Sequence, residues 1–453
     1  MIIRRLFGTD GIRGVANRDP LIPEIVVKLG RAAAHFWNCS SAGKVRVLIG
    51  KDTRLSSNML ESALIAGLCS AGVDVLQVGI LPTPAIAYLT RRIGADAGVV
   101  ISASHNSFED NGIKFISRDG FKLSDEKEKE IEDIFFGSET QILRSVGSEL
   151  GRVIQLSNAS DSYEEFLFQT IMVTGISFPK WKIVVDCANG AVCQIVPRIL
   201  KHLGAAVIIL NHEPNGTNIN KNCGSLHPEI VQQVVREQGA TLGLSFDGDG
   251  DRTILVDEKG GIINGDHILG ICASHLESQG KLPHNLVVGT VMCNLGLERY
   301  LRERGISLLR TPVGDRYVME EMQKRNAILG GEPSGHIVFL SHHTTGDGIL
   351  TSLQVLSIIQ QTGRSLSDLT RQVICLPQIL LNIKVKRQLD LPKYTEIQEI
   401  IQKLENQLRG KGRLLVRYSG TEPLLRIMVE GEDRSHIQSL ANEIVAAIEN
   451  KLG

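Results

Sequence analysis

Short apolar runs and helical patterns alternate in the same order three times along this sequence. The first unit places VRVLIG (45–50) before a helical pattern, a glycine and a second apolar run, VDVLQVG (73–79). The order returns from WKIVVD (181–186) and again from LVVGTV (286–291). Strand, loop, helix, glycine and strand make a βαβ unit, and strands without polar alternation suit a parallel sheet covered on both faces. The repeat therefore predicts three similar α/β domains with parallel or mixed sheets.

Each unit continues with a further apolar segment that runs into a polar loop. These segments read AGVVISASHN (97–106), LGLSFDGDGDR (242–252) and AILGGEPSGH (327–336). Open α/β sheets bind ligands beyond the carboxyl ends of their strands. We therefore expect the three loops to meet in one composite site between the domains.

The pattern changes after about residue 371. Apolar runs at 373–386 and 412–431 flank a helical pattern at 394–408, and a last helical pattern covers 436–452. Strands and helices without a βαβ rhythm predict a small C-terminal α+β domain.

Composition narrows the class of protein. The 453 residues include 49 basic and 50 acidic side chains, a formal net charge of −1. This balance gives no electrostatic reason to expect binding to nucleic acid or to a membrane. The N-terminus does not read as a secretory signal, and no apolar run reaches the roughly 18 residues of a membrane span. The eight cysteines form no CxxC pair, which is typical of reduced thiols in a cytoplasmic protein.

The loop DGDGDR (247–252) carries three carboxylates at alternate positions. Three negative charges this close are costly unless a cation offsets them, and oxygen ligands with open positions suit Mg²⁺. Asp247, Asp249 and Asp251 are therefore candidate metal ligands. An acidic, solvated turn is the alternative, while an EF-hand is excluded because Arg252 stands where the loop needs glycine.

The loop SASHN (102–106) offers a serine after a buried strand. Serine alone is weak evidence, because it caps helices and forms turns far more often than it reacts. Its placement favours Ser104 as a nucleophile, with His105 beside it. Lys114 follows in DNGIKF and is a candidate acid, base or phosphate contact, with an exposed strand lysine as the alternative.

Two further loops offer groups for a phosphorylated sugar. Glu332 and Ser334 in GEPSGH can accept from and donate to sugar hydroxyls, although this pattern by itself fits any polar loop. In RYSGTEP (417–423), small residues offer backbone N–H groups while Arg417 and Arg426 offer paired contacts to a phosphate dianion. A hairpin turn with arginines at its strand edges explains the last segment equally well.

Together, and in this order, these loops resemble those of the α-D-phosphohexomutases over the whole chain. The family's serine loop reads TASHNP and its phosphate loop RPSGTEP, so Ser107 and Tyr418 replace two prolines here, while DGDGDR matches completely. The resemblance implies four domains around a central cleft. They are a phosphoserine domain (1–155), a metal-binding domain (156–257), a sugar-recognition domain (258–370) and a C-terminal phosphate-binding domain (371–453).

The resemblance also implies roles for individual residues. Ser104 becomes the phosphoserine and, with the three aspartates, a ligand of one Mg²⁺, and a catalytic sugar bisphosphate is the implied activator. The other implied catalytic residues are Arg13, His105, Lys114 and Arg252. The implied substrate-binding residues are Asp315, Arg316, Glu332, Ser334, His336, Arg417, Ser419, Gly420, Thr421 and Arg426.

Three segments resemble the amino-sugar branch of this family: FGTDGIRG (7–14), NINKNCGSLHPE (218–229) and TPVGDRYV (311–318). That branch interconverts glucosamine 6-phosphate and glucosamine 1-phosphate. A glucose- or mannose-phosphate mutase on the same scaffold is the alternative. A catalytically silent sugar-phosphate-binding protein is a second alternative, which the complete set of reactive residues argues against. The expected partner is a small sugar phosphate, with monomer and homodimer both open, and Lys114 and His105 are both open as the general base.

Overall fold

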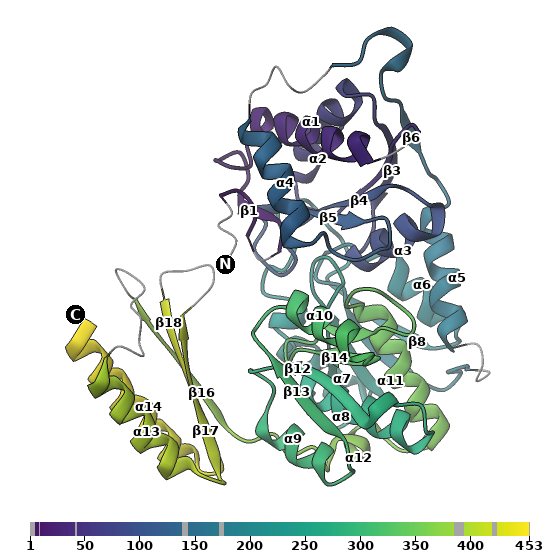
Figure 1. Cartoon of the computed structure of the whole chain (residues 1–453). Helices are drawn as coiled ribbons and strands as arrows, with labels where there is room; N and C mark the ends of the chain where they lie inside the picture. The colour runs from purple at the N-terminus through teal and green to yellow at the C-terminus, as the bar shows by residue number, and fades with distance from the viewer. Residues whose placement is uncertain are drawn as a thin grey trace.

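The computed structural model describes residues 5–8, 10–40, 43–137, 144–171, 176–384, 394–418 and 424–452. Within this part of the chain the strands form four sheets, of six, five, four and three strands. Three α/β layers lie together and the last, antiparallel sheet stands to one side with its helices (Figure 1).

The first three sheets share one arrangement of four strands. Their orders are β5-β4-β2-β3, β10-β9-β7-β8 and β15-β14-β12-β13, with the first pair antiparallel and the remaining pairs parallel. The repeat predicted from the apolar runs is therefore present in the topology. The strand bounds are β2 (Arg46–Lys51), β3 (Asp74–Ile80), β4 (Ala97–Ile101), β5 (Asp110–Ser117), β7 (Lys182–Asp186), β8 (Ala206–Leu210), β9 (Leu242–Phe246), β10 (Thr253–Val256), β12 (Leu286–Thr290), β13 (Ser307–Thr311), β14 (Leu329–Gly331) and β15 (Ile337–Phe339).

Short strands extend two of these sheets. The first sheet gains β1 (Ile12–Val15) beside β5 and β6 (Val153–Gln155) beside β3. The second gains β11 (Ile262–Ile263), which pairs with β10 although it lies beyond the domain boundary that we place at residue 257. The four domain ranges given above stay a prediction.

Helices cover both faces of the first sheet. On one face, α1 (Pro23–Ser40), α2 (Ser57–Ser70) and α4 (Asp125–Phe136) enclose a core that includes Trp37 and Phe115. On the other face, α3 (Thr83–Ile93) contributes to a continuous apolar core that runs through all three α/β domains. The other helices are α5 (Ala159–Ile171), α6 (Ile195–His202), α7 (Glu229–Gln238), α8 (Gly265–Ser278), α9 (Leu295–Arg302), α10 (Asp315–Arg325), α11 (Gly348–Thr362) and α12 (Leu366–Thr370), with 3₁₀ turns at Gly147–Glu149, Gly224–Leu226 and Pro283–Asn285.

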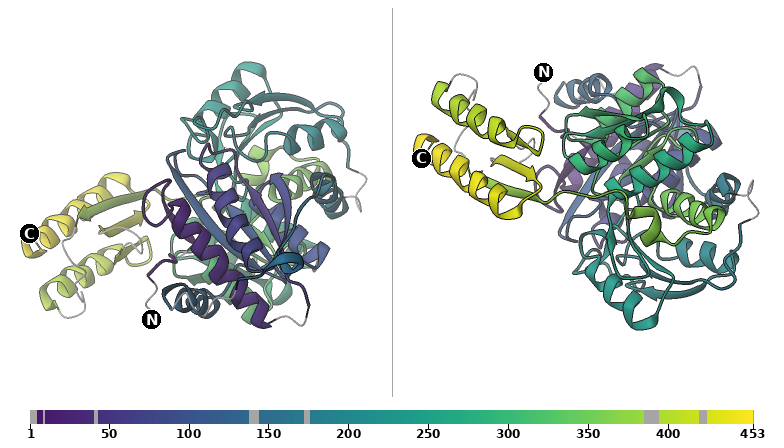
Figure 2. Two further views of the ribbon diagram at one scale, coloured as in Figure 1. Left: turned by 90° about the horizontal axis from the view of Figure 1, so that it is seen from above. Right: turned by 90° about the horizontal axis from the view of Figure 1, so that it is seen from below.

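The C-terminal domain has a core of its own. Its sheet, β16-β18-β17, packs against α13 and α14 around apolar residues between Ile379 and Ile448. Figure 2 shows this unit projecting from the rest of the molecule in both views. Its elements are β16 (Gln378–Lys384), α13 (Thr395–Leu408), β17 (Gly412–Tyr418), β18 (Leu424–Gly431) and α14 (Arg434–Leu452).

Polar contacts join this domain to the third one. Arg413 donates to the carbonyl oxygen of Val291 at 2.8 Å, and the buried carboxylate of Glu430 accepts from the backbone N–H of Leu295 at 2.9 Å. Three similar α/β domains with mixed sheets and a C-terminal α+β domain confirm the fold class expected from the sequence.

Two further expectations bear on the class of protein. None of the helices in the described part of the chain is both long enough and apolar enough to cross a membrane. The eight cysteines are free thiols, five of them buried.

Candidate active site

A cavity of about 590 Å³ lies where the four domains meet. Because β4, β9 and β14 occupy the same place in their sheets, the loops that follow them face this cavity from three sides. The lining side chains include Arg13, Ser104 and His105 from the first domain, Asp251 and Arg252 from the second, Asp315, Glu332 and His336 from the third, and Arg417 and Arg426 from the last.

Ser104 adopts a left-handed backbone conformation, with φ of 51°. A non-glycine residue rarely holds this conformation unless its surroundings fix it, and such strain gathers at functional sites. Here the Ser104 N–H donates to Ser102 Oγ at 2.9 Å, and the Ser104 hydroxyl donates to Asp247 Oδ2 at 2.6 Å. The turn therefore aims the hydroxyl of a nearly buried serine at the aspartate loop of another domain.

The Arg54 side chain holds the serine loop in place through several hydrogen bonds. Its guanidinium donates to the carbonyl oxygens of Ser104 at 2.8 Å, Asn106 at 2.9 Å and Asp110 at 3.0 Å, and also to that of Ser107. A planar, multi-donor guanidinium suits this task, since it fixes several oxygens at once. The loop is therefore clamped although Ser107 replaces the family's proline.

Asp52 completes this clamp. Its carboxylate accepts from Arg54 Nε at 2.8 Å and from the Ser102 hydroxyl, so a buried charge pair is fully hydrogen-bonded.

The three aspartates of the DGDGDR loop form a buried cluster. One carboxylate oxygen from each aspartate lies within 4.8 Å of the other two. Glycines make this possible: Gly250 has φ of 72°, and a Cβ on Gly248 would stand 2.7 Å from Ser104 O. The loop therefore needs small residues both to turn and to approach the serine.

Two observations indicate that this cluster suits a cation. The Oδ1 atoms of Asp249 and Asp251 are buried and have no hydrogen-bond partner among the described residues. Burial and the other two carboxylates raise the pKa of Asp247 well above its ordinary value. Unsatisfied oxygens and mutual repulsion are costly in a folded protein, and a divalent ion relieves both.

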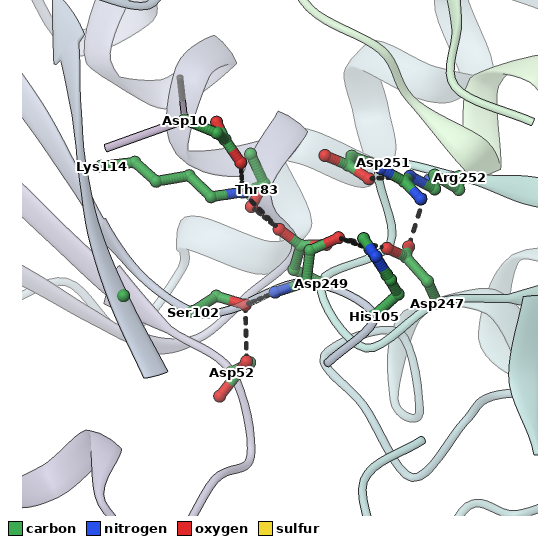
Figure 3. A network of polar contacts seen from close by, with 12 residues as sticks. Asp10, Asp52, Thr83, Ser102, His105, Lys114, Asp247, Asp249, Asp251 and Arg252 are labelled. Atoms are coloured by element: carbon green, nitrogen blue, oxygen red, sulfur yellow. Dashed lines mark hydrogen bonds and ion pairs between the residues drawn. The ribbon is translucent and has the colours of Figure 1, made fainter. Parts of the chain in front are cut away.

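Lys114, on β5, reaches the same cluster from the first domain. Its ammonium group lies 3.1 Å from Asp249 Oδ2 and 3.2 Å from Asp10 Oδ2 (Figure 3). Burial alone would lower the pKa of Lys114, but Asp10 and Asp249 outweigh it and raise the pKa. Thr83 donates to Asp249 Oδ2 at 2.7 Å and completes the contacts.

Two cations and a neutral imidazole line the same cavity as Ser104. His105 Nδ1 lies 3.4 Å from Ser104 Oγ, and burial with Arg252 and Arg13 nearby lowers the pKa of His105 to about 4. The imidazole is therefore neutral at physiological pH. The pKa values of Arg13 and Arg252 are raised by aspartates that outweigh their burial, so both are cations.

The third domain adds a second imidazole. His336 Nδ1 lies 3.5 Å from Asp251 Oδ2, and His336 Nε2 lies 3.6 Å from Asp315 Oδ2. These carboxylates raise the pKa of His336 despite its burial. Glu332 Oε1 accepts from the N–H of Gly314 at 3.2 Å, which holds the two loops of this domain together.

The C-terminal domain presents two arginines to the cavity. Arg417 on β17 and Arg426 on β18 stand directly opposite each other in the antiparallel register. Burial and the charge of Arg426 lower the pKa of Arg417. Like charges opposite each other on neighbouring strands are destabilising, and a dianion between them offsets the repulsion.

Four family models match the chain in order. They are described as phosphoglucomutase/phosphomannomutase alpha/beta/alpha domain I (residues 4–141), domain II (161–261), domain III (264–375) and C-terminal domain (380–447). The chain belongs to the phosphoglucomutase/phosphomannomutase family. The resemblance drawn from the four loops is thereby confirmed.

Relatives in this family are similar along their whole length. The chain is 51% identical over 450 residues to a phosphoglucosamine mutase of Syntrophotalea carbinolica, covering 99% of this chain and 98% of that protein. It is 50% identical over 457 residues to a phosphoglucosamine mutase of Geobacter sp. strain M21, covering 100% and 99%.

Solved structures of the family share the fold. A phosphoglucomutase/phosphomannomutase family protein from Burkholderia thailandensis matches with a TM-score of 0.81 at 25% identity, covering 100% of this chain and 99% of that one. The N-acetylphosphoglucosamine mutase of Aspergillus fumigatus, solved in complex with GlcNAc-6P and magnesium, matches with a TM-score of 0.69 at 18% identity, covering 99% and 96%.

Some residues that the family resemblance assigns to substrate lie elsewhere. The Arg316 guanidinium turns away from the cavity, donates to Leu123 O at 3.0 Å and pairs with Glu128 of α4 at 3.1 Å. Ser334 is exposed and does not line the cavity. Ser419, Gly420 and Thr421 lie outside the described residues.

Sequence patterns do not predict every residue of this site individually. Asp10 lies within FGTDGIRG and Asn220 within NINKNCGSLHPE, but only as parts of longer matches. Arg54 follows the first strand in a polar loop, and its place at a strand's carboxyl end is a signal that could have identified it. Lys122 contacts Asp10 and Asp315, and no local pattern marks it.

Proposed function

We propose that this protein interconverts glucosamine 6-phosphate and glucosamine 1-phosphate, an intramolecular phosphoryl transfer. One observation carries the proposal: the Ser104 hydroxyl lies 2.6 Å from a buried aspartate cluster, in a cavity lined by all four domains. The amino-sugar preference rests on relatives named phosphoglucosamine mutase that are 51% and 50% identical over the full chain.

Ser104 acts as a phosphorylated carrier in this proposal. The free hydroxyl of the sugar phosphate attacks the phosphorus on Ser104. The bond between phosphorus and Oγ breaks, a bond from phosphorus to the sugar oxygen forms, and the hydroxyl proton passes to a base beside the serine. The product is a sugar bisphosphate. After this bisphosphate turns over in the cavity, Ser104 Oγ takes the other phosphoryl group and the monophosphate leaves.

The chain's own residues position these steps. Arg13, Arg252 and Lys114 surround the transferring group with positive charge, and such preorganised charge accounts for most of the catalysis of phosphoryl transfer. His105 and Lys114 are the two candidates for proton transfer: the neutral imidazole can accept a proton directly, whereas the Lys114 ammonium group would first have to give its proton up. Mg²⁺ held by Asp247, Asp249, Asp251 and a phosphoryl oxygen on Ser104 would neutralise the charge that develops there.

The other end of the substrate needs a separate holder. Glu332 and His336 line the cavity and suit sugar hydroxyls, while Arg417 and Arg426 suit the phosphate that does not react. The bisphosphate must bind in two orientations. The arginine pair therefore has to bind a phosphate dianion in both of them, without depending on contacts to one face of the sugar ring.

A direct assay tests the proposal. Purified protein with Mg²⁺ and a catalytic sugar bisphosphate is given glucosamine 1-phosphate, glucose 1-phosphate or mannose 1-phosphate, and product is followed by ³¹P NMR. We expect the highest kcat/KM with the amino sugar and none with Ser104→Ala. Higher efficiency with glucose or mannose phosphate would assign the chain to the other branch. Binding without turnover of any of the three would indicate a silent binding protein.

A further inference from the structure

Charged side chains from three domains form a closed ring beside the cavity. Lys114 contacts Asp249 at 3.1 Å and Asp10 at 3.2 Å, and Lys122 contacts Asp10 in turn. On the other side, Lys122 contacts Asp315, which lies 3.6 Å from His336 Nε2. His336 Nδ1 lies 3.5 Å from Asp251, which returns the ring to the aspartate loop.

Lys122 has a distinct place in this ring. Asp10, Asp315, His336 and Asp251 line the cavity, whereas Lys122 does not. Lys122 lines a neighbouring cavity of about 230 Å³ on the far side of Asp315 and His336. Lys122 therefore contacts two carboxylates of the cavity lining, Asp10 in the first domain and Asp315 in the third, without lining that cavity itself.

The contacts of Lys122 are strong ones. Its side chain is only 14% exposed, so solvent screens its ion pairs weakly. Burial alone would lower the pKa of Lys122, but the Asp10 and Asp315 carboxylates outweigh it and raise the pKa. Without the ammonium group, these two partly buried carboxylates would lose the cation that they share.

The geometry also links the two domains mechanically. Asp315 is the first residue of α10, and Arg316 beside it pairs with Glu128 of α4 in the first domain. The first turn of α10 thus contacts the first domain through ion pairs of two kinds. In one kind α10 supplies the carboxylate, and in the other it supplies the guanidinium group. Of these, the Lys122 pair is the one that continues to Asp10 and Lys114, and through Asp249 to the aspartate loop that the Ser104 hydroxyl contacts.

We infer that Lys122 is a positioning residue, which ties Asp10 of the first domain to Asp315 of the third and so sets the place of the sugar relative to Ser104. This inference rests on the proposed function. Its expected effect is on transfer rather than on binding, because the phosphate-holding arginines lie in another domain. A misplacement of about 1 Å can cost about a hundredfold in rate.

The test compares Lys122→Met, Lys122→Gln and Lys122→Arg with the parent, using glucosamine 1-phosphate. For Lys122→Met we expect kcat to fall about tenfold to a hundredfold with KM changed less than about threefold. More bisphosphate should also escape per turnover. Lys122→Arg should recover most of the rate, because it keeps the charge and can contact two carboxylates. If Lys122→Met does not fold, Lys122→Gln replaces it.

Hydrogen exchange supplies a readout that needs no activity. Residues 313–318 should exchange faster in Lys122→Met than in the parent, which separates this inference from the proposed function. Lys127→Met is the matched control, since Lys127 is an exposed lysine of the same neighbouring cavity, and it should leave kcat unchanged. A parent-like kcat in Lys122→Met, a failure of Lys122→Arg to recover, or unchanged exchange would each overturn the inference.

Discussion

The side-chain amide of Asn220 donates to the carbonyl oxygen of Ser104 at 2.8 Å. The same group donates to Asn106 O at 2.9 Å, so a residue of the second domain holds the serine loop of the first. Arg54 donates to the same two oxygens. The Ser104 loop is thus held by residues of two domains.

Replacing Asn220 by Asp should therefore slow the reaction while leaving substrate binding nearly intact. Aspartate keeps the shape and tolerates the left-handed conformation, with φ of 56°, but cannot donate. Losing hydrogen bonds to buried carbonyls costs about 1–3 kcal/mol, so kcat should fall about tenfold. Asn222→Asp is the control, because Asn222 is exposed and has φ of 51°. Equal rates in the two variants would show that the contact is dispensable.

Ser104→Ala and Ser104→Gly should both be inactive but differ in stability. Alanine has to adopt φ of 51°, which glycine does at little cost, so Ser104→Gly should be more stable by about 1 kcal/mol. Intact-mass spectra should show phosphate on the parent and on neither variant. A lower Tm for Ser104→Gly than for Ser104→Ala would argue against backbone strain at this position.

Asp247→Asn should have opposite effects with and without metal. Burial and the other two carboxylates raise the pKa of Asp247, so its charge is unfavourable while no cation offsets it, and the amide should preserve or raise the metal-free Tm. Mg²⁺ should raise the Tm of the parent, because a ligand that binds only the folded state stabilises it, and the variant should lose this rise. Asp257→Asn, outside the cluster, should keep it. A full Mg²⁺ shift in Asp247→Asn would remove Asp247 from the ligand set.

Arg417→Ala should weaken substrate without loss of stability. Removing one charge-assisted contact costs about 1.5–3 kcal/mol, which is roughly a tenfold to hundredfold rise in KM. The Tm should stay or rise, since the repulsion with Arg426 is relieved. Ser104 phosphorylation should be unaffected, and Arg409→Ala, at an exposed position, serves as control. If Arg417→Ala converts substrate like the parent, the C-terminal domain does not hold the phosphate.

Asp266 should make stability fall as pH rises. Burial, with Glu430 nearby, raises the pKa of Asp266 to about 7 in the folded protein, against an ordinary 3.8. Between these values the folded state binds the extra proton, so folding loses stability as pH rises through the window. Asp266→Asn should remove this loss, and its Tm relative to the parent should increase from pH 5 to pH 8. A Tm difference that does not depend on pH would contradict the assignment.

The sequence predicts some residues of this site well and others poorly. The sequence predicts the Asp cluster and Ser104 as site residues because each lies in a short pattern at the carboxyl end of an apolar strand, and the structure brings them together. The repeat was visible because strands buried on both faces are continuously apolar. Arg316 was assigned to substrate by its neighbours in TPVGDRYV, but the first turn of α10 directs it to α4.

Residues that act through distant partners could not be identified in this way. Lys122 bonds Asp315, 193 residues away, and its own segment reads as ordinary surface sequence. Arg54 and Asn220 converge on Ser104 from different domains, and a single sequence carries no sign of that meeting. A short sequence pattern predicts the chemistry of its own residues. The contacts of Lys122, Arg54 and Asn220 depend instead on how the domains pack against one another.

The separate core of the C-terminal domain has a consequence for how this protein loses activity. Apolar contacts link the first three domains into one body. The C-terminal domain has its own apolar core between Ile379 and Ile448, and polar contacts such as that of Arg413 with Val291 join it to the third domain. Cooperative unfolding follows such cores, so the C-terminal domain can melt as a unit of its own. Mild heating would then yield molecules in which the Ser104 loop and the aspartate cluster stay folded while Arg417 and Arg426 no longer line the cavity.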